Sequence, residues 1–176
     1  MSGEGAAFSP PVLPALPIVG EAVGETPART ANEKQTAKRA IEILLKRDEG
    51  FHNPTRAERD ALLVGFAMRR QVLYGAAFDL IRLAGPVDLS DPASICAHLD
   101  QITVYETKST NKPSTKPDFG GYFFDLTTAE LLVGQSLGAR YRFAFVNTLS
   151  GDWIEKSLPE VFAKAHKIYP KWAISF

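Results

Sequence analysis

The stretch Ile-Thr-Val-Tyr-Glu-Thr-Lys-Ser-Thr, residues 102–110, decides how this chain folds. Its β-branched and aromatic residues are typical of a strand, and the turn-forming residues that follow mark the end of that strand. Alternate side chains of a strand point to the same face, so Glu106 and Lys108 project together and Val104 continues their face. A carboxylate and an ammonium beside a hydrophobic core are costly unless they pair or hold a metal ion. The stretch therefore predicts a strand that carries a charged site.

The composition is that of an ordinary soluble globular domain, with 45% hydrophobic and 23% charged residues in a chain of 176. Lys plus Arg number 20 and Asp plus Glu also number 20, so no overall positive charge indicates a nucleic-acid partner. The single cysteine, Cys96, excludes an internal disulfide and a multi-cysteine zinc site, and it favours a cytoplasmic protein. No apolar run reaches the roughly 20 residues that a membrane-spanning helix needs.

Two parts of the chain differ in composition. Residues 1–30 are rich in Pro, Gly and Ala and are predicted to form an N-terminal arm; an undocked tail and a segment docked on its own domain or on a second copy are the alternatives. Residues 31–176 are predicted to form one domain. Its patterns predict helices over about 30–47 and 55–73, strands over 76–83, 102–110 and 120–126, a helix over 127–137 and a strand over 139–148. A mixed sheet with helices on its faces packs this order most simply, so the predicted class is α/β or α+β with a central mixed β-sheet.

A second acid stands on the strand predicted before the Glu106 strand. Antiparallel pairing of these two strands brings Asp79, Glu106 and Lys108 onto one patch. Two neighbouring carboxylates repel each other, and a hard divalent cation, Mg²⁺ or Mn²⁺, relieves that repulsion. A lysine beside such an ion can steady an attacking water or neutralise a phosphate oxygen. These are the parts that metal-assisted hydrolysis of a phosphodiester requires. Three loop residues are alternatives for the first carboxylate: Asp88, Asp91 and Asp100.

Asp79 followed by Glu106-Thr107-Lys108 resembles the PD-(D/E)xK nuclease superfamily, whose restriction-endonuclease-like core is a mixed sheet with flanking helices. The resemblance covers about residues 32–148, although Phe78 stands where the family name has proline. Four segments are most similar to NO VEIN C-terminal-like and Mrr-type domains: 75–79, 106–110, the Phe123-Phe124 strand with its following helix, and 141–146. The resemblance implies that Asp79 and Glu106 bind the metal and that the Thr107 carbonyl is a candidate third ligand. Lys108 is then the catalytic base or a charge stabiliser.

Three further residues are candidates for auxiliary roles. Gln135 lies on the helix predicted after the motif strand, where related nucleases have a glutamine that points toward the site. A solvent-exposed helix residue is the alternative interpretation of Gln135. Glu42 and Glu58, on the first two predicted helices, are candidates for an additional carboxylate, with a surface charge as the alternative for each.

Four basic residues are predicted to contact a phosphate backbone, which gives affinity without sequence specificity: Lys112, Lys116, Arg140 and Arg142. The predicted function is a Mg²⁺- or Mn²⁺-dependent deoxyribonuclease of the restriction or defence type. A homodimer is expected, because cutting both strands of duplex DNA needs two active sites. The alternative is a catalytically inactive, nuclease-like module that binds nucleic acid or assembles with a partner, in which Glu106 and Lys108 form a structural ion pair.

Overall fold

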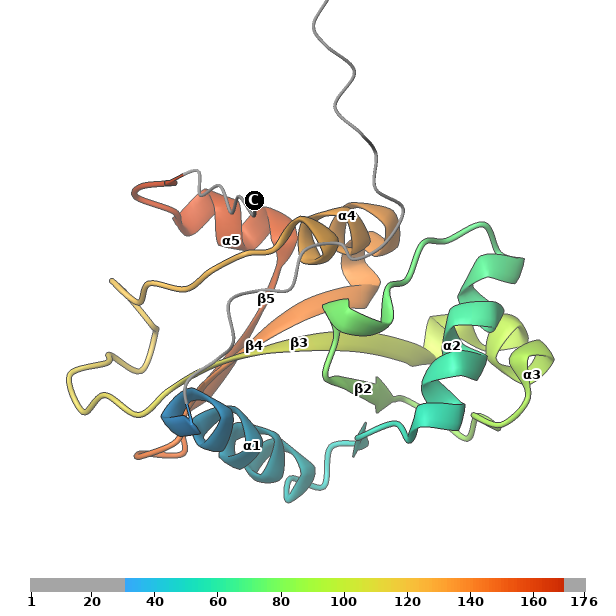
Figure 1. Ribbon diagram of the computed structural model, residues 1–176, viewed down its shortest axis with the longest axis horizontal. Helices are drawn as coiled ribbons and strands as arrows, with labels where there is room; N and C mark the ends of the chain where they lie inside the picture. Colours follow the sequence, from blue (N-terminus) through green and yellow to red (C-terminus); the bar gives the residue numbers. More distant parts are fainter. Residues whose placement is uncertain (1–30, 170–176) are drawn as a thin grey trace, which may run out of the picture. The chain divides into compact units, whose positions relative to one another are not determined.

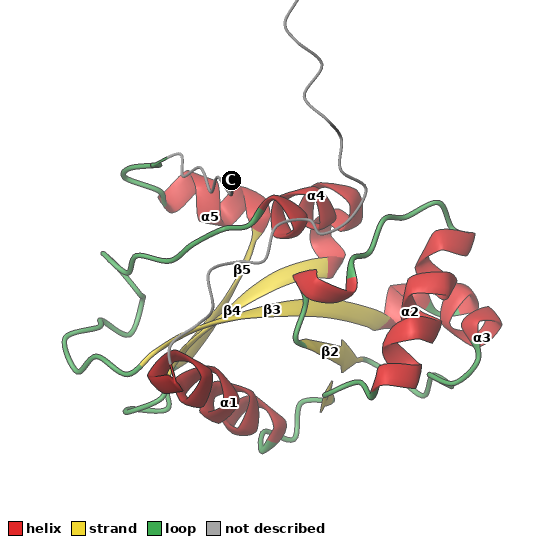
Figure 2. Ribbon diagram, in the orientation of Figure 1, coloured by secondary structure: helices red, strands yellow, loops and turns green. Residues whose placement is uncertain are grey.

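A five-stranded mixed sheet lies at the centre of the computed structural model, which describes residues 31–169 (Figures 1 and 2). Its strands follow the chain in order: β1 (Phe51–His52), β2 (Leu80–Leu83), β3 (Ile102–Thr110), β4 (Tyr141–Asn147) and β5 (Trp153–Ser157). Neighbouring strands are antiparallel except β3 and β4, which are parallel. A parallel pair needs a crossover connection, and the helix α4 (Thr128–Leu137) lies within it. The predicted class, a mixed sheet flanked by helices, is confirmed.

The other helices in the described range are α1 (Ala31–Leu45), α2 (Arg56–Met68), α3 (Pro92–Ala97) and α5 (Leu158–Lys164), with short 3-10 turns η1 (Gly75–Ala77), η2 (Leu99–Gln101) and η3 (Gly138–Arg140). No helix among residues 31–169 combines the length and the apolar character that crossing a membrane requires. The predicted N-terminal arm, residues 1–30, lies outside the described residues.

Hydrophobic side chains pack on both faces of the sheet. On one face, Ala40 and Leu44 of α1 pack with Leu80 and Tyr105. The opposite face carries the larger cluster, to which α2 and α4 contribute. Alternate residues of β3 divide between these faces, since Val104 belongs to the larger cluster and Tyr105 to the smaller. Figure 1 shows α1 on one side of the sheet and α4 and α5 on the other.

Capping residues set the starts of two helices that the sequence predicts. Thr55 and Thr127 each accept a hydrogen bond from the backbone N–H three residues later, and Glu58 and Glu130 return a bond to the cap residue. The helix α2 ends at Met68, earlier than predicted, because Arg70 adopts a left-handed backbone with φ of 57°.

Two predicted strands differ in the structure. Residues 120–126 form no strand, so the predicted Phe123-Phe124 strand is wrong; the aromatic rings of this segment pack as an irregular loop against β4. The strand predicted over 76–83 begins only at Leu80, because η1 occupies residues 75–77. The short strand β1 and the edge strand β5 are additions that the sequence patterns did not predict.

Candidate functional site

Asp79 and Glu106 face each other across two antiparallel strands. Leu80 pairs with Tyr105, so Asp79, one residue earlier, stands opposite Glu106. The Asp79 N–H donates to the Tyr105 carbonyl at 2.8 Å, and Asp79 Oδ2 accepts from the Thr107 N–H at 2.9 Å. The backbone of the motif strand therefore fixes the Asp79 carboxylate next to Glu106.

Lys108 is buried between two carboxylates. Its Nζ lies 3.1 Å from Glu106 Oε1 and 2.8 Å from Glu130 Oε2. Lys108 is 7% exposed, and both glutamates are 3% exposed. Asp79 is half-buried and is the least buried of the four residues. We call Asp79, Glu106, Lys108 and Glu130 the charged cluster.

Glu130 is the member of the cluster that was not predicted. The buried residues of α4 are Glu130, Val133, Gly134 and Leu137, which share one face at helical spacing. Gln135, five positions after Glu130, lies about 140° around the helix and is exposed. The helix after the motif strand therefore sends a glutamate to the cluster, and the predicted Gln135 points to solvent.

Glu130 serves two partners with one carboxylate. Its Oε2 accepts from the Thr127 N–H at 3.1 Å as part of the helix cap and lies 2.8 Å from Lys108 Nζ. A helical stripe extended backward from Val133 and Leu137 reaches this position and would have identified it. The pattern Thr127-x-x-Glu130 is also typical of a helix cap at the protein surface. The pattern therefore does not show that the Glu130 side chain points inward.

The charged cluster contains three carboxylates and one ammonium. Burial raises the pKa of Glu106 well above its usual value; the charges of Asp79 and Glu130 raise it further, and Lys108 offsets part of this. Burial, followed by the charges of Glu106, Glu130 and Asp79, also raises the pKa of the neighbouring Tyr141 hydroxyl. Negative charge therefore exceeds positive charge in the cluster, and a proton or a cation relieves the excess.

Two side chains hold the segment that carries Asp79. The Arg59 guanidinium, on α2, donates to the carbonyls of Phe78 at 2.8 Å and Asp79 at 2.6 Å, and its charge lies 4.5 Å from the centre of the Phe78 ring. The Tyr141 hydroxyl donates to the Ala77 carbonyl at 2.5 Å. Arg59 thus links α2 to the site.

The donor set is compatible with a hard divalent ion held by two carboxylates. Among the described residues, no three His, Cys, Asp or Glu side chains are arranged so that they could hold a metal ion together. Mg²⁺ is usually held by one or two carboxylates together with water and substrate oxygens. Asp79 and Glu106 supply two, and their mutual repulsion raises the pKa of Glu106. Thr107, whose carbonyl is the predicted third ligand, is buried between Glu106 and Lys108 on β3, and its N–H bonds to Asp79.

The other predicted acids lie outside the charged cluster. Glu42 is exposed on α1, the helix on the opposite face of the sheet. Glu58 bonds to the Thr55 N–H and to His52. The loop acids also have local roles or solvent exposure: Asp88 accepts from Ser90, Asp91 caps α3, and Asp100 is exposed on η2. Asp79 is therefore the predicted first carboxylate that the fold brings to Glu106.

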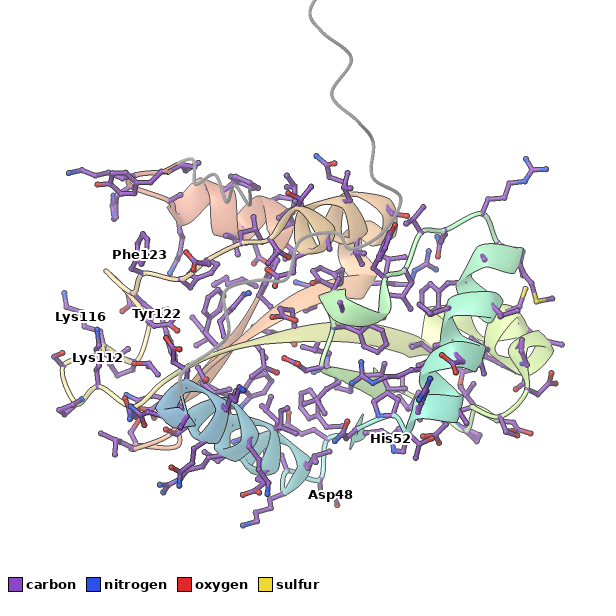
Figure 3. All side chains as sticks on the ribbon, in the orientation of Figure 1. Asp48, His52, Lys112, Lys116, Tyr122 and Phe123 are labelled. Atoms are coloured by element: carbon purple, nitrogen blue, oxygen red, sulfur yellow. The ribbon has the colours of Figure 1, made fainter. Side chains whose placement is uncertain are left out.

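The predicted phosphate-binding residues form two separate sets. Lys112 and Lys116 are exposed on the loop after β3 (Figure 3). Arg142 is paired with Tyr105 in the parallel register, so it lies near the start of β3, about 20 Å along the strand from Lys112. Arg142 also forms an ion pair with Glu160 at 3.2 Å. Arg140, on η3, lies at that same end of the sheet.

Comparisons of the chain with family models, with curated proteins and with solved structures found no match.

Proposed function

We propose that this protein is a divalent-metal-dependent nuclease that hydrolyses DNA phosphodiesters, with Asp79, Glu106 and Lys108 as its catalytic residues. The observation that carries the proposal is the buried position of Lys108 between Glu106 and Glu130, with the charge of a third carboxylate, Asp79, acting on Glu106. A structural ion pair needs one carboxylate, and the surplus destabilises the fold. Such surplus charge at a buried lysine is typical of a catalytic site. The resemblance to the PD-(D/E)xK superfamily supports the same roles.

In this proposal Asp79 and Glu106 hold the ion. Bound Mg²⁺ or Mn²⁺ supplies Lewis-acid stabilisation of the phosphoryl oxygen and lowers the pKa of a bound water. The Thr107 N–H keeps Asp79 in position through its hydrogen bond to Oδ2. Lys108 directs its ammonium to the scissile phosphate or to the attacking water. Glu130 Oε2 lies 2.8 Å from Lys108 Nζ, so Lys108 keeps one carboxylate partner when Glu106 binds the metal ion.

A cleavage assay tests the proposal. Plasmid and single-stranded DNA are incubated with the full chain in Mg²⁺, in Mn²⁺ and in chelator. We expect cleavage in both metals and none in chelator, and Lys108→Ala should lower the rate by about 100-fold or more. Lys38→Ala, which removes an exposed lysine of α1, is the matched control and should cleave like wild type. Equal cleavage by wild type and Lys108→Ala would exclude this role of Lys108.

The second candidate function is a nuclease-like binding module without catalysis. It is favoured by the two short contacts through which Glu106 and Glu130 already neutralise Lys108. Calorimetric titration with Mn²⁺ separates the two functions. A nuclease site should give binding heat that Glu106→Gln abolishes, whereas a purely structural ion cluster should give none. DNA as substrate and a homodimer as the active form are parts of the first proposal.

A further inference from the structure

The loop of residues 111–127 borders the charged cluster at both of its ends. It begins after β3, the strand of Glu106 and Lys108, and it ends at Thr127, the cap of the helix that carries Glu130. The loop therefore joins the two elements that carry Glu106, Lys108 and Glu130. The loop is traced in Figure 1 between β3 and α4.

Aromatic side chains fix this loop to the sheet. The rings of Phe119, Tyr122 and Phe124 lie 5.8, 6.2 and 5.0 Å from the ring of Phe145. The Tyr122 hydroxyl donates to the Ser109 carbonyl at 2.7 Å. These contacts hold the backbone on both sides of residue 123 and so set the direction of its side chain.

Phe145 connects the loop to the charged cluster. It pairs with Lys108 in the parallel register of β3 and β4, and it belongs to the cluster of core residues on that face. The aromatic rings of the loop therefore pack against the immediate neighbour of the proposed catalytic lysine.

Phe123 is the most exposed large hydrophobic residue of the described chain, at 70%. Its ring lies 6.4 Å from that of Tyr169, which is 64% exposed. Single exposed apolar residues are common and need no explanation. The Phe123 ring differs because the residues on either side of it, Tyr122 and Phe124, pack against Phe145. Their contacts keep the Phe123 ring in its exposed position.

Two lysines lie on the loop that carries the exposed ring of Phe123, together with two exposed aspartates, Asp118 and Asp125. Lys112 and Lys116 are exposed on the same loop, and Figure 3 shows them on the same side of the molecule as Phe123. The Gly120 N–H, and after it the charges of Lys164 and Lys116, hold the pKa of Asp118 below its usual value. Aromatic faces next to lysines fit single-stranded nucleic acid, because bases stack on the rings while ammonium groups meet the phosphates.

We infer that the loop 111–127 binds an unpaired stretch of DNA, with a base stacked on Phe123 and phosphates at Lys112 and Lys116. The inference rests on the proposed function for its substrate and names the part of that substrate that the loop recognises. Stacking accepts any base, so this contact selects unpaired DNA without selecting sequence.

Binding measured in chelator tests the inference without any need for cleavage. The full chain is titrated against labelled single-stranded and double-stranded oligonucleotides of the same sequence, and fluorescence anisotropy is recorded. We expect tighter binding of the single strand. Phe123→Leu, which keeps an apolar side chain but removes the ring, should weaken single-strand binding about tenfold. Lys112→Ala and Lys116→Ala should each lower the magnitude of the slope of log K against log salt concentration by roughly 0.7. Phe123→Leu should leave that slope unchanged.

Met68→Ala is the matched control, since Met68 is a 54% exposed apolar residue at the end of α2, away from the loop in Figure 1. It should bind like wild type. Phe123→Trp should retain binding, and its added fluorescence relative to wild type should be quenched by the single strand. Unchanged affinity in Phe123→Leu overturns the inference. Conversion of a wild-type dimer to a monomer by Phe123→Leu, without loss of DNA affinity, also overturns it and assigns the ring to a second copy.

The two proposals fail separately in these measurements. Phe123-dependent binding without metal-dependent cleavage supports the loop site and contradicts the nuclease. Metal-dependent cleavage with no effect of Phe123→Leu on binding supports the nuclease and contradicts the loop site.

Discussion

Glu106 is held in an environment that disfavours its own charge. Burial, Asp79 and Glu130 raise its pKa, and Lys108 compensates only in part. In a chain optimised for stability alone, a neutral residue would fill this position. A group of this kind is expected where function needs the charge.

Glu106→Gln should therefore stabilise the protein at neutral pH, by about 1 kcal/mol. The folded state binds this proton more tightly than the unfolded state does, so wild-type stability falls as pH rises from the ordinary value of 4.5 through the raised pKa. The gain should be largest above that range and should shrink as pH falls toward 4.5. Chemical denaturation of both proteins across this pH range measures the difference.

The control for this comparison is Glu42→Gln, which removes an exposed carboxylate on α1 and should change little. A purely structural Glu106–Lys108 pair predicts the reverse sign. Destabilisation of Glu106→Gln at neutral pH would show that the pair with Lys108 outweighs the repulsion from the other two carboxylates.

Glu130 is a positioning residue in this scheme, because it acts through Lys108. Glu130→Gln keeps the shape and an acceptor for the Thr127 N–H but loses the charge that holds the ammonium. We expect kcat for DNA cleavage to fall about tenfold, the cost of one charge-assisted hydrogen bond, with little change in KM. Gln135→Ala, on the exposed side of the same helix, should leave both constants unchanged. An unaltered kcat in Glu130→Gln would contradict the assigned role.

At the scale of elements, the segment from η1 to β2 depends on one side chain of α2. Arg59 bonds to the Phe78 and Asp79 carbonyls and lies over the Phe78 ring. Hydrogen bonds from a charged group that is shielded from water are among the stronger ones in a protein. The position of Asp79 relative to Glu106 therefore depends on how α2 is placed.

Arg59→Ala should lower the free energy of unfolding by about 2 kcal/mol and reduce cleavage, since two carbonyls lose their partner and Asp79 loses its support. Arg59→Lys keeps the charge but not the planar fork, so we expect it to recover only part of both losses. Arg56→Ala, an exposed arginine at the start of α2, is the matched control. Urea denaturation measures the free energy of unfolding, and the plasmid assay measures cleavage. Full cleavage activity in a destabilised Arg59→Ala would show that Arg59 supports the fold but not the site.

Sequence patterns predicted those elements whose local signals agree with their tertiary role. Residues 102–110 form the predicted strand, and the capped helices begin at Thr55 and Thr127 as expected. The segment Tyr122-Phe123-Phe124 has strand-forming residues but is a loop, because its rings find partners on Phe145 rather than along a neighbouring strand. Aromatic composition alone does not distinguish these two outcomes.

The same limit applies to the charged cluster. Strand alternation predicted that Glu106 and Lys108 share a face, and antiparallel pairing with the preceding strand added Asp79. The stripe of α4 marks Glu130 as facing inward, but its contact with Lys108 depends on the crossover between the parallel strands, which no local pattern specifies. Arg59 was missed because its partners are backbone carbonyls, those of Phe78 and Asp79, and side-chain patterns do not identify such acceptors.

At the scale of the whole molecule, the parallel pair β3–β4 organises both faces of the sheet. The crossover between these strands carries loop 111–127 and α4 to the face of Lys108, whereas α1 closes the opposite face. Charged residues and loop therefore share one side, and α1 has a structural role on the other.

A chain that lacks residues 1–30 should fold with a single cooperative transition, and its free energy of unfolding should lie within about 1 kcal/mol of the full chain. The reason is that, within residues 31–169, the buried members of both core clusters lie between Ala40 and Leu158. Removal of residues 1–47, which deletes Ala40 and Leu44 with the rest of α1, should instead abolish cooperative unfolding because the Tyr105 face loses its cover. Circular dichroism during thermal unfolding compares the three chains, and sedimentation velocity shows whether the predicted homodimer needs the arm. Loss of the cooperative transition on removing residues 1–30 alone would mean that the arm completes the fold of the domain.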